Sequence, residues 1–126
     1  MSIKNILCFG DSNTWGFVPG AFDPKTLYMK RCSILERWTG LLRDILGKNY
    51  HIIEKGLNGR ITNVEYSGLS RRSGTSYILP CLYSYSPLDL VILNIGRNDI
   101  KVIFDRSMME ISEMMAEIID LARSTS

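Results

Sequence analysis

The chain has 126 residues, of which 45% are hydrophobic and 22% charged, so its composition is that of a globular domain with a hydrophobic core. A net charge of +2, from 15 basic and 13 acidic residues, is too balanced to favour binding to nucleic acid or to an anionic membrane. The three cysteines have no CxxC spacing, which argues against a zinc site or a disulfide framework and indicates reduced thiols. The first apolar run is too short for a secretory leader or a membrane span, so we expect one cytoplasmic domain over residues 1–126.

The first two predicted elements are a buried strand and an amphipathic helix. Ile3 to Phe9 is a short apolar run followed by Gly10, a pattern typical of a strand covered on both faces. A helix is predicted from Ser33, its N-cap, to Leu46, with Gly47 after its end. Its apolar positions recur at spacings of three and four: Ile34, Leu35, Trp38, Leu41, Leu42, Ile45 and Leu46.

Two further strands and a second helix are predicted in the rest of the chain. Tyr50 to Glu54 and Leu88 to Asn94 are apolar runs, each followed by a polar turn that contains glycine. Ser107 to Leu121 is predicted to be a helix whose methionines fill the core, with Ser107 and Glu110 forming a capping box.

Because strands and helices alternate, the sequence predicts an α/β domain with a parallel sheet and right-handed crossovers, the flavodoxin-like three-layer arrangement. In such sheets functional groups collect at the carboxyl ends of the strands. The long connections, Gly16 to Cys32 and Ile61 to Pro87, are therefore expected to form loops or partly helical segments over that edge.

Polar turns follow all three predicted strands. They are Gly10-Asp11-Ser12-Asn13, Gly56-Leu57-Asn58-Gly59-Arg60 and Gly96-Arg97-Asn98-Asp99. At the edge where these turns meet, Ser12 is a candidate nucleophile with its own backbone N–H facing the reacting centre. The N–H of Gly59 and the side-chain amide of Asn98 would add two more donors, and three donors around one hydroxyl make an oxyanion hole.

Two other interpretations of these turns remain open. Gly-Asp-Ser and Asn98-Asp99 are also typical of helix caps and turns, because Asp, Ser and Asn side chains bond their own backbone. A flavodoxin-like anion site, in which Ser12, Asn13 and Thr14 cradle a phosphate, is the second. The combination of the three turns favours acyl chemistry.

In these motifs the chain resembles the GDSL-type esterases, also called SGNH hydrolases. FGDSNTWG is similar to the first motif of that family, GLNGR to the second and GRND to the third. The arylesterase and acyltransferase branch is the most similar, also through RWTG at residues 37–40, YILPCL at 77–82 and PLDLVI at 87–92. The resemblance extends from about residue 4 to about residue 105.

The resemblance implies that Ser12 is the nucleophile and that its own N–H, the N–H of Gly59 and the side chain of Asn98 form the oxyanion hole. Asp11 would order the nucleophile loop. Trp15 would shape the acyl or alcohol pocket together with the aromatic-rich loop that follows it, and packing of Trp15 over the sheet edge is the alternative. No metal or organic cofactor is implied.

Arg97 departs from the small hydroxyl residue that the family usually has in its third motif. A cation at this position either alters the charge preference for the substrate or extends into solvent, and we expect the latter.

The general base is the element of the family pattern that this chain lacks. The family takes it from an Asp-x-x-His motif near the C-terminus, and no such motif occurs here. The only histidine, His51, is predicted at the amino end of the second strand, on the edge opposite Ser12. Asp99 and Asp105 are weak bases, since an unperturbed carboxyl has a pKa of about 4.

We therefore expect an SGNH hydrolase-like domain that is truncated at its C-terminus and leaves its third strand exposed. A partner chain or a second copy would cover that edge. The expected function is hydrolysis of a small-molecule carboxylic ester, or acyl transfer, through an acyl-Ser12 intermediate, impaired by the missing base. The alternative is a non-catalytic fragment, or a binding or assembly module, that retains the acyl pocket.

Overall fold

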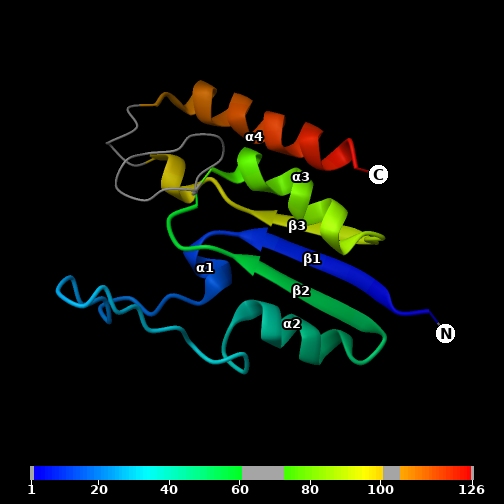
Figure 1. The fold of residues 1–126 in the computed structure, drawn as a ribbon, viewed down its shortest axis with the longest axis horizontal. Coiled ribbons are helices and arrows are strands. Elements are labelled where there is room, and N and C mark those ends of the chain that lie inside the picture. The colour runs from blue at the N-terminus through cyan, green and yellow to red at the C-terminus, as the bar shows by residue number, and fades with distance from the viewer. Residues whose placement is uncertain (1, 61–72, 101–105, 126) are drawn as a thin grey trace.

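A three-stranded parallel sheet forms the centre of the computed structural model, which describes residues 2–60, 73–100 and 106–125 (Figure 1). The strands are β1 (Lys4–Gly10), β2 (Tyr50–Gly56) and β3 (Leu90–Asn94), in the order β2-β1-β3. Gly10 at the end of β1 pairs with the last residue of each neighbour, so all three strands end at the same edge.

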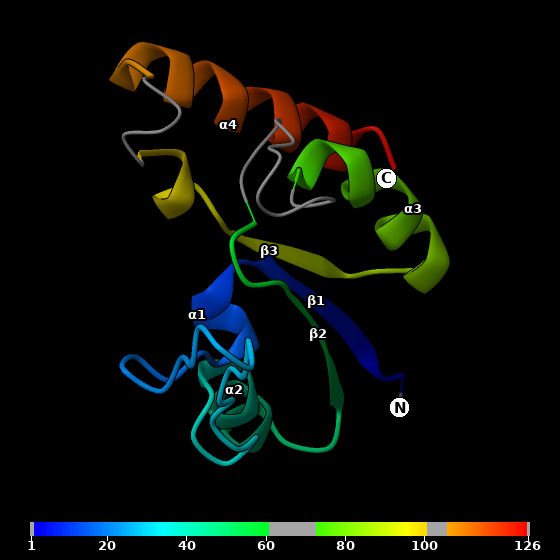
Figure 2. The same ribbon diagram turned by 60° about the vertical axis from the view of Figure 1, so that its left-hand side comes forward.

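Helices cover both faces of this sheet and make a three-layer α/β/α arrangement (Figure 2). On one face lie the short α1 (Ser12–Trp15) and α2 (Trp38–Leu46). On the other lie α3 (Gly74–Tyr85) and α4 (Met108–Arg123), and the 3-10 helix η1 (Arg97–Ile100) follows β3. The α/β, flavodoxin-like prediction is confirmed. None of these helices, over the described ranges, has the length and apolarity needed to cross a membrane.

The hydrophobic core lies between the sheet and the layer of α3 and α4. Alternate residues of the strands point to this side, and the buried members of the cluster are Leu7, Phe9, Ile53, Ile78, Cys81, Leu82 and Ile118. Because Cys8 pairs with Glu54 between these inward-pointing positions, both residues face the opposite layer, which contains α2.

The predicted strands and the last helix are confirmed, with small shifts of their ends. Ser107 caps α4 as predicted, since its hydroxyl accepts from the Glu110 N–H at 3.1 Å while the Glu110 carboxylate accepts from the Ser107 N–H at 3.0 Å. β3 begins at Leu90 instead of Leu88. In the connection from Ile61 to Pro87, residues 61–72 lie outside the described residues, and α3 occupies most of the remainder.

The predicted start of the first long helix is wrong. α2 begins at Trp38, and Ser33 opens a turn in which its hydroxyl accepts from the Leu35 N–H at 3.2 Å. The apolar spacing continued through this turn, but the backbone of Arg37 is extended, with φ −65° and ψ 143°, and its side chain is held by β2. Tertiary hydrogen bonds thus override the helical pattern of the first five residues.

An arm connects α1 to this turn. Two antiparallel bridges, Phe17 with Arg31 and Asp23 with Tyr28, close it into a hairpin-like loop. The Cys32 N–H also donates to the Gly16 carbonyl at 2.8 Å, so both ends of the arm lie beside the end of α1. The tip extends away from the sheet (Figure 1).

Candidate active site

Ser12 is the first residue of α1 and follows the end of β1 after one intervening residue. That residue, Asp11, is only 2% exposed, and its carboxylate accepts from the Asn13 N–H at 3.0 Å. Asp11 is therefore the N-cap of α1, so the helix-cap interpretation of Gly-Asp-Ser describes the structure correctly. This cap also fixes the turn that carries Ser12, which is half-buried.

Glycines allow α1 to pack directly on the strand ends. A Cβ atom on Gly10 would lie 2.1 Å from Thr14 Oγ1, and one on Gly56 would lie 2.3 Å from the Trp15 nitrogen. Neither space admits a side chain. Thr14 is fully buried and accepts from Trp38 Nε1 at 3.3 Å, so α2 holds α1 from the other side.

The second turn lies beside the first. The Leu57 N–H donates to the Gly10 carbonyl at 3.1 Å, and the Arg60 N–H returns to the Leu57 carbonyl at 3.1 Å. Gly59 has a φ of 75° within this turn, in the left-handed region that favours glycine.

Asn98, in η1 after β3, is 9% exposed and donates through Nδ2 to the Arg60 carbonyl at 3.0 Å. The third turn is thereby bonded to the second. At the same edge, the Asp11 N–H donates to the Asn94 carbonyl at 3.4 Å. Arg97 is exposed, which agrees with the prediction that it extends into solvent.

Arg60 joins the same group of turns through its side chain. Its Nη1 donates to the carbonyls of Gly10 at 3.1 Å and Lys55 at 2.6 Å. Sequence reasoning placed Arg60 in the second motif without assigning it a role. No feature of the sequence distinguishes it from a surface arginine.

A pocket of about 620 Å³ borders the second turn and reaches around the β2 edge. It is lined by Trp15, Arg31, Glu54, Lys55, Gly56, Leu57, Arg60, Ser73, Ser76 and Tyr77. Ser12 is not among these residues. Trp15 forms a wall of the pocket and packs against Gly56. Its role in shaping an acyl or alcohol pocket stays a prediction.

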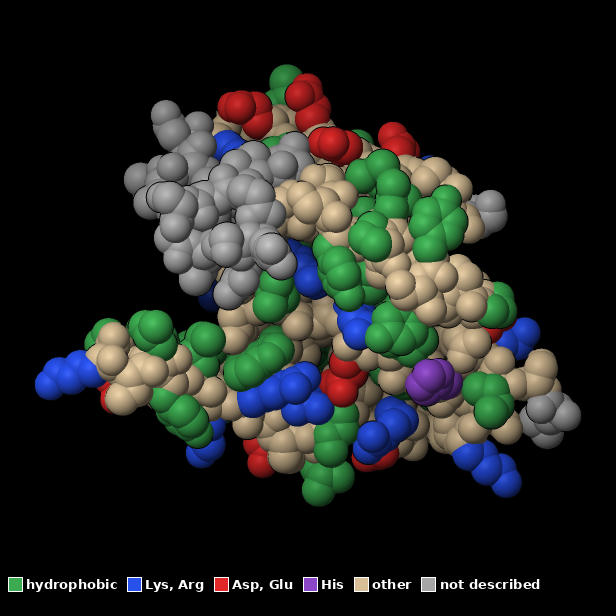
Figure 3. All heavy atoms as spheres, viewed as in Figure 1, with side chains coloured by type: hydrophobic (Ala, Val, Ile, Leu, Met, Phe, Trp, Pro, Cys, Tyr) green, Lys and Arg blue, Asp and Glu red, His purple; other side chains and the backbone are tan. Residues whose placement is uncertain are grey.

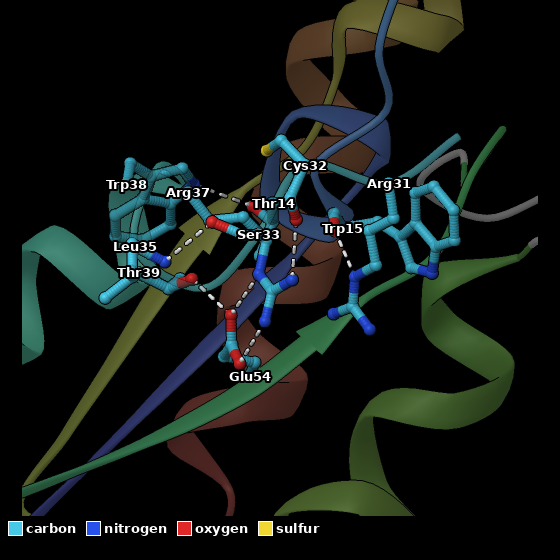
Figure 4. A network of polar contacts seen from close by, with 10 residues as sticks. All are labelled: Thr14, Trp15, Arg31, Cys32, Ser33, Leu35, Arg37, Trp38, Thr39 and Glu54. Carbon is cyan, nitrogen blue, oxygen red and sulfur yellow. Dashed lines mark hydrogen bonds and ion pairs between the residues drawn. The ribbon is translucent and has the colours of Figure 1, made fainter. Parts of the chain in front are cut away.

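Arg31 covers the indole of Trp15 from the base of the arm. Its guanidinium carbon lies 5.1 Å from the ring centroid, and its Nε donates to the Trp15 carbonyl at 2.6 Å (Figure 4). Figure 3, which has the orientation of Figure 1, shows basic side chains among hydrophobic ones in the middle of the visible face of the molecule. The pocket therefore combines aromatic walls with positive charge.

A polar network centred on Glu54 fastens the turn before α2 to β2 (Figure 4). The carboxylate accepts from Arg37 at 2.9 and 3.2 Å and from the Thr39 hydroxyl at 2.5 Å. Partial burial acts to raise the pKa of Glu54, but the hydrogen bonds from Arg37 and Thr39 and the nearby positive charges outweigh it, so the pKa is lowered. Sequence reasoning missed this network, for which the RWTG motif was the available signal.

His51 lies far from the turns. It is exposed, pairs with Asn5 near the start of β1, and its Nδ1 is 3.3 Å from Asn5 Oδ1. Figure 3 shows this single histidine toward the amino ends of the strands. The prediction that His51 occupies the edge opposite Ser12 is confirmed. Asp105 and the side chain of Asp99 lie outside the described residues.

Comparison with solved structures identifies esterases. The aryl esterase of M. smegmatis is 41% identical with a TM-score of 0.87, and the match covers 94% of this chain and 54% of that one. A carbohydrate acetylesterase from Sinorhizobium meliloti is 39% identical with a TM-score of 0.85, over 94% and 54% of the two chains. AlinE4, an SGNH-hydrolase family esterase, is 22% identical with a TM-score of 0.67, over 100% and 56%.

No protein-family model matches the chain, and neither does any curated protein. The chain spans about half the length of the esterases that it matches.

The described residues have the α/β/α fold of the SGNH hydrolases. Within that class, the chain is similar in sequence and structure to aryl esterases and carbohydrate acetylesterases, which confirms the resemblance found in its motifs.

Proposed function

We propose that this chain carries the nucleophile and the oxyanion hole of a carboxylic ester hydrolase. Ser12 is the nucleophile, and the donors to the developing oxyanion are the N–H groups of Ser12 and Gly59 and the side-chain amide of Asn98. The observation that carries the proposal is the bonding of three turns at one sheet edge, from Gly10 through Arg60 to Asn98. The similarity to two kinds of esterase supports it.

In the proposed reaction, Ser12 Oγ attacks the carbonyl carbon of a small ester, and the carbonyl oxygen becomes an oxyanion. The hydroxyl proton of Ser12 passes to water or another base and from there to the departing alcohol. The three donors stabilise this charge, the alcohol leaves, and water or a second alcohol releases the acyl group from Ser12. Loss of one such donor typically lowers turnover roughly a hundredfold to a thousandfold. Trp15 and Asp11 contribute the pocket wall and the fixed turn, respectively.

The chain is expected to be a weak catalyst on its own. A serine hydroxyl needs a base to remove its proton, and the only histidine is at the other end of the strands. Oxyanion stabilisation and binding alone leave rates of roughly a thousandfold to ten-thousandfold over water. This favours, as the second candidate function, a module that binds acyl compounds without turning them over.

A fluorophosphonate followed by intact mass tests the proposal, with Ser12→Ala as the negative control. Ser76→Ala, which replaces a serine in the pocket wall, is the matched control. We expect slow addition of one label that Ser12→Ala abolishes and Ser76→Ala retains. A folded chain that takes no label, or takes it equally in Ser12→Ala, would refute the nucleophile assignment and leave the binding module.

A further inference from the structure

Arg60 is a charged side chain that is only 4% exposed. Burial of a charge is unfavourable unless hydrogen bonds compensate the loss of water. Here two main-chain carbonyls on adjacent strands contribute such bonds, that of Gly10 at the end of β1 and that of Lys55 near the end of β2. The guanidinium thus bridges the two strand ends from which the first and second turns begin.

Two aromatic rings lie against this guanidinium. Its central carbon lies 4.0 Å from the ring centroid of Phe9 and 5.5 Å from that of Tyr77. Both hydrogen bonds come from Nη1, and a flat, delocalised cation is suited to stacking on aromatic rings, which an ammonium group cannot reproduce. The aromatic contacts therefore favour arginine over lysine at this position.

The main chain of the same residue reaches the third turn. The Arg60 carbonyl accepts from Asn98 Nδ2 at 3.0 Å, and its N–H bonds to Leu57 within the second turn. A side-chain amide has two N–H donors, so this bond orients the amide and leaves its second N–H for another acceptor. Gly59 immediately precedes Arg60, and its N–H direction is set by the same turn.

We propose that Arg60 is the positioning residue of the oxyanion hole. Its side chain holds the second turn against the end of β1, and its carbonyl orients the Asn98 amide, so that the donors from Gly59 and Asn98 converge on the oxygen bonded at Ser12. The permanent charge, held in a site shielded from water, adds a field that favours an oxyanion at this edge. This inference rests on the proposed function and assigns Arg60 no contact with substrate.

The test compares Arg60→Lys with wild type by two readouts. The first is the ¹H–¹⁵N spectrum, in which the Asn98 side-chain amide and the Gly59 backbone amide report donor orientation. The second is the rate of fluorophosphonate labelling of Ser12. Arg37→Lys is the matched control, because the Arg37 guanidinium also makes two hydrogen bonds to β2, but to the Glu54 carboxylate on the sheet face opposite Phe9.

We expect Arg60→Lys to shift the Asn98 and Gly59 signals and to slow labelling of Ser12 at least tenfold. Arg37→Lys should leave these signals and the labelling rate unchanged, even where it lowers Tm by a comparable amount. Unshifted signals in folded Arg60→Lys, equal shifts in the control, or shifted signals with an unchanged labelling rate would each overturn the inference. If wild type takes no label, the nucleophile proposal fails, and the spectra alone decide whether Arg60 orients the two donors.

Tyr77→Leu covers the case in which Arg60→Lys does not fold. Tyr77 is 39% exposed on α3, so its replacement leaves the core intact. Removing this second ring takes away one of the two aromatic contacts of the guanidinium, and we expect smaller shifts of the same two signals and a smaller decrease in labelling rate. Signals at their wild-type positions in Tyr77→Leu would count against the inference.

Discussion

The cysteines show how burial controls the chemistry of a residue. Burial, together with the Glu54 carboxylate, raises the pKa of Cys8 to about 11, and burial also raises the pKa of Cys81. Both side chains are almost inaccessible, with exposures of 0% and 1%, whereas Cys32 is half-buried. Since the thiolate is the reactive form, a raised pKa and the lack of access both make Cys8 unreactive in the folded chain.

We therefore predict that a disulfide reagent at pH 8 modifies one thiol of the folded chain quickly and the other two only as the chain unfolds. Cys32→Ser removes the fast phase. Any fast thiol that remains in that variant would contradict the buried position of Cys8 or Cys81.

A second prediction at the residue scale concerns how the contribution of Glu54 to the free energy of unfolding depends on pH. Its pKa in the folded chain lies below the ordinary value of 4.5, so the stabilisation it provides is complete above that value and is lost as the pH falls through the folded pKa. Glu54→Gln should lower the free energy of unfolding by about 2 kcal/mol at pH 7, and by less as the pH falls from 5 to 3. Denaturant titrations at several pH values measure this difference, with the exposed Glu36→Gln as control. A difference that stays constant with pH would argue against the ion pair.

The sequence predicted the role of a residue where a local pattern defines that role, and did not predict it where a tertiary contact does. Asp11 and Ser12 stand next to a strand end, where an acid and a hydroxyl are conspicuous. Glu54 and Arg60 acquire their roles only from partners 17 and 50 residues away, Arg37 and Gly10. Neither separation leaves a periodic signal in the sequence.

At the scale of elements, α4 begins with a reciprocal cap between Ser107 and Glu110. Ser107→Ala removes the oxygen that accepts the Glu110 N–H, and we expect a loss of about 1 kcal/mol in the free energy of unfolding. Ser112→Ala, an exposed position inside the same helix, should have little effect or a small stabilising one. Equal effects of the two substitutions would show that the cap adds nothing beyond helix propensity.

The elements that sequence reasoning found are those with a complete local signature. α4 has its cap and its apolar stripe, and the strands have apolar runs with glycine after them. α3 was missed as a helix in its own right because Pro80 lies inside it and its apolar positions are mixed with tyrosines and serines. The start of α2 was misplaced because the spacing of Ile34 and Leu35 fits a helix as well as a turn.

For the molecule as a whole, β3 is the edge strand of the described sheet on the side away from β2. Leu90 in this strand is 50% exposed, and beside it an apolar hollow is lined by Leu88, Val91, Leu93, Ile119 and Ala122, among others. An apolar strand edge favours pairing with another chain. We predict that the purified chain self-associates as its concentration rises.

Leu90→Lys places a charge on that edge and should lower the association, measured by sedimentation velocity, without changing Ser12 labelling. Tyr83→Lys, at an exposed position on α3, is the control for added charge. A chain that remains monomeric at high concentration would contradict the expectation that a partner or a second copy covers β3.

In the arm between Phe17 and Arg31, one part fixes the ends of the loop and another part presents side chains to solvent. Its base is closed by main-chain pairing next to α1, while its tip carries exposed apolar side chains such as Phe22, Leu27 and Tyr28. Lengthening a loop whose ends are already joined costs little, since closure entropy grows only with the logarithm of its length. The sequence and length of the tip can therefore change while the strand ends keep their register.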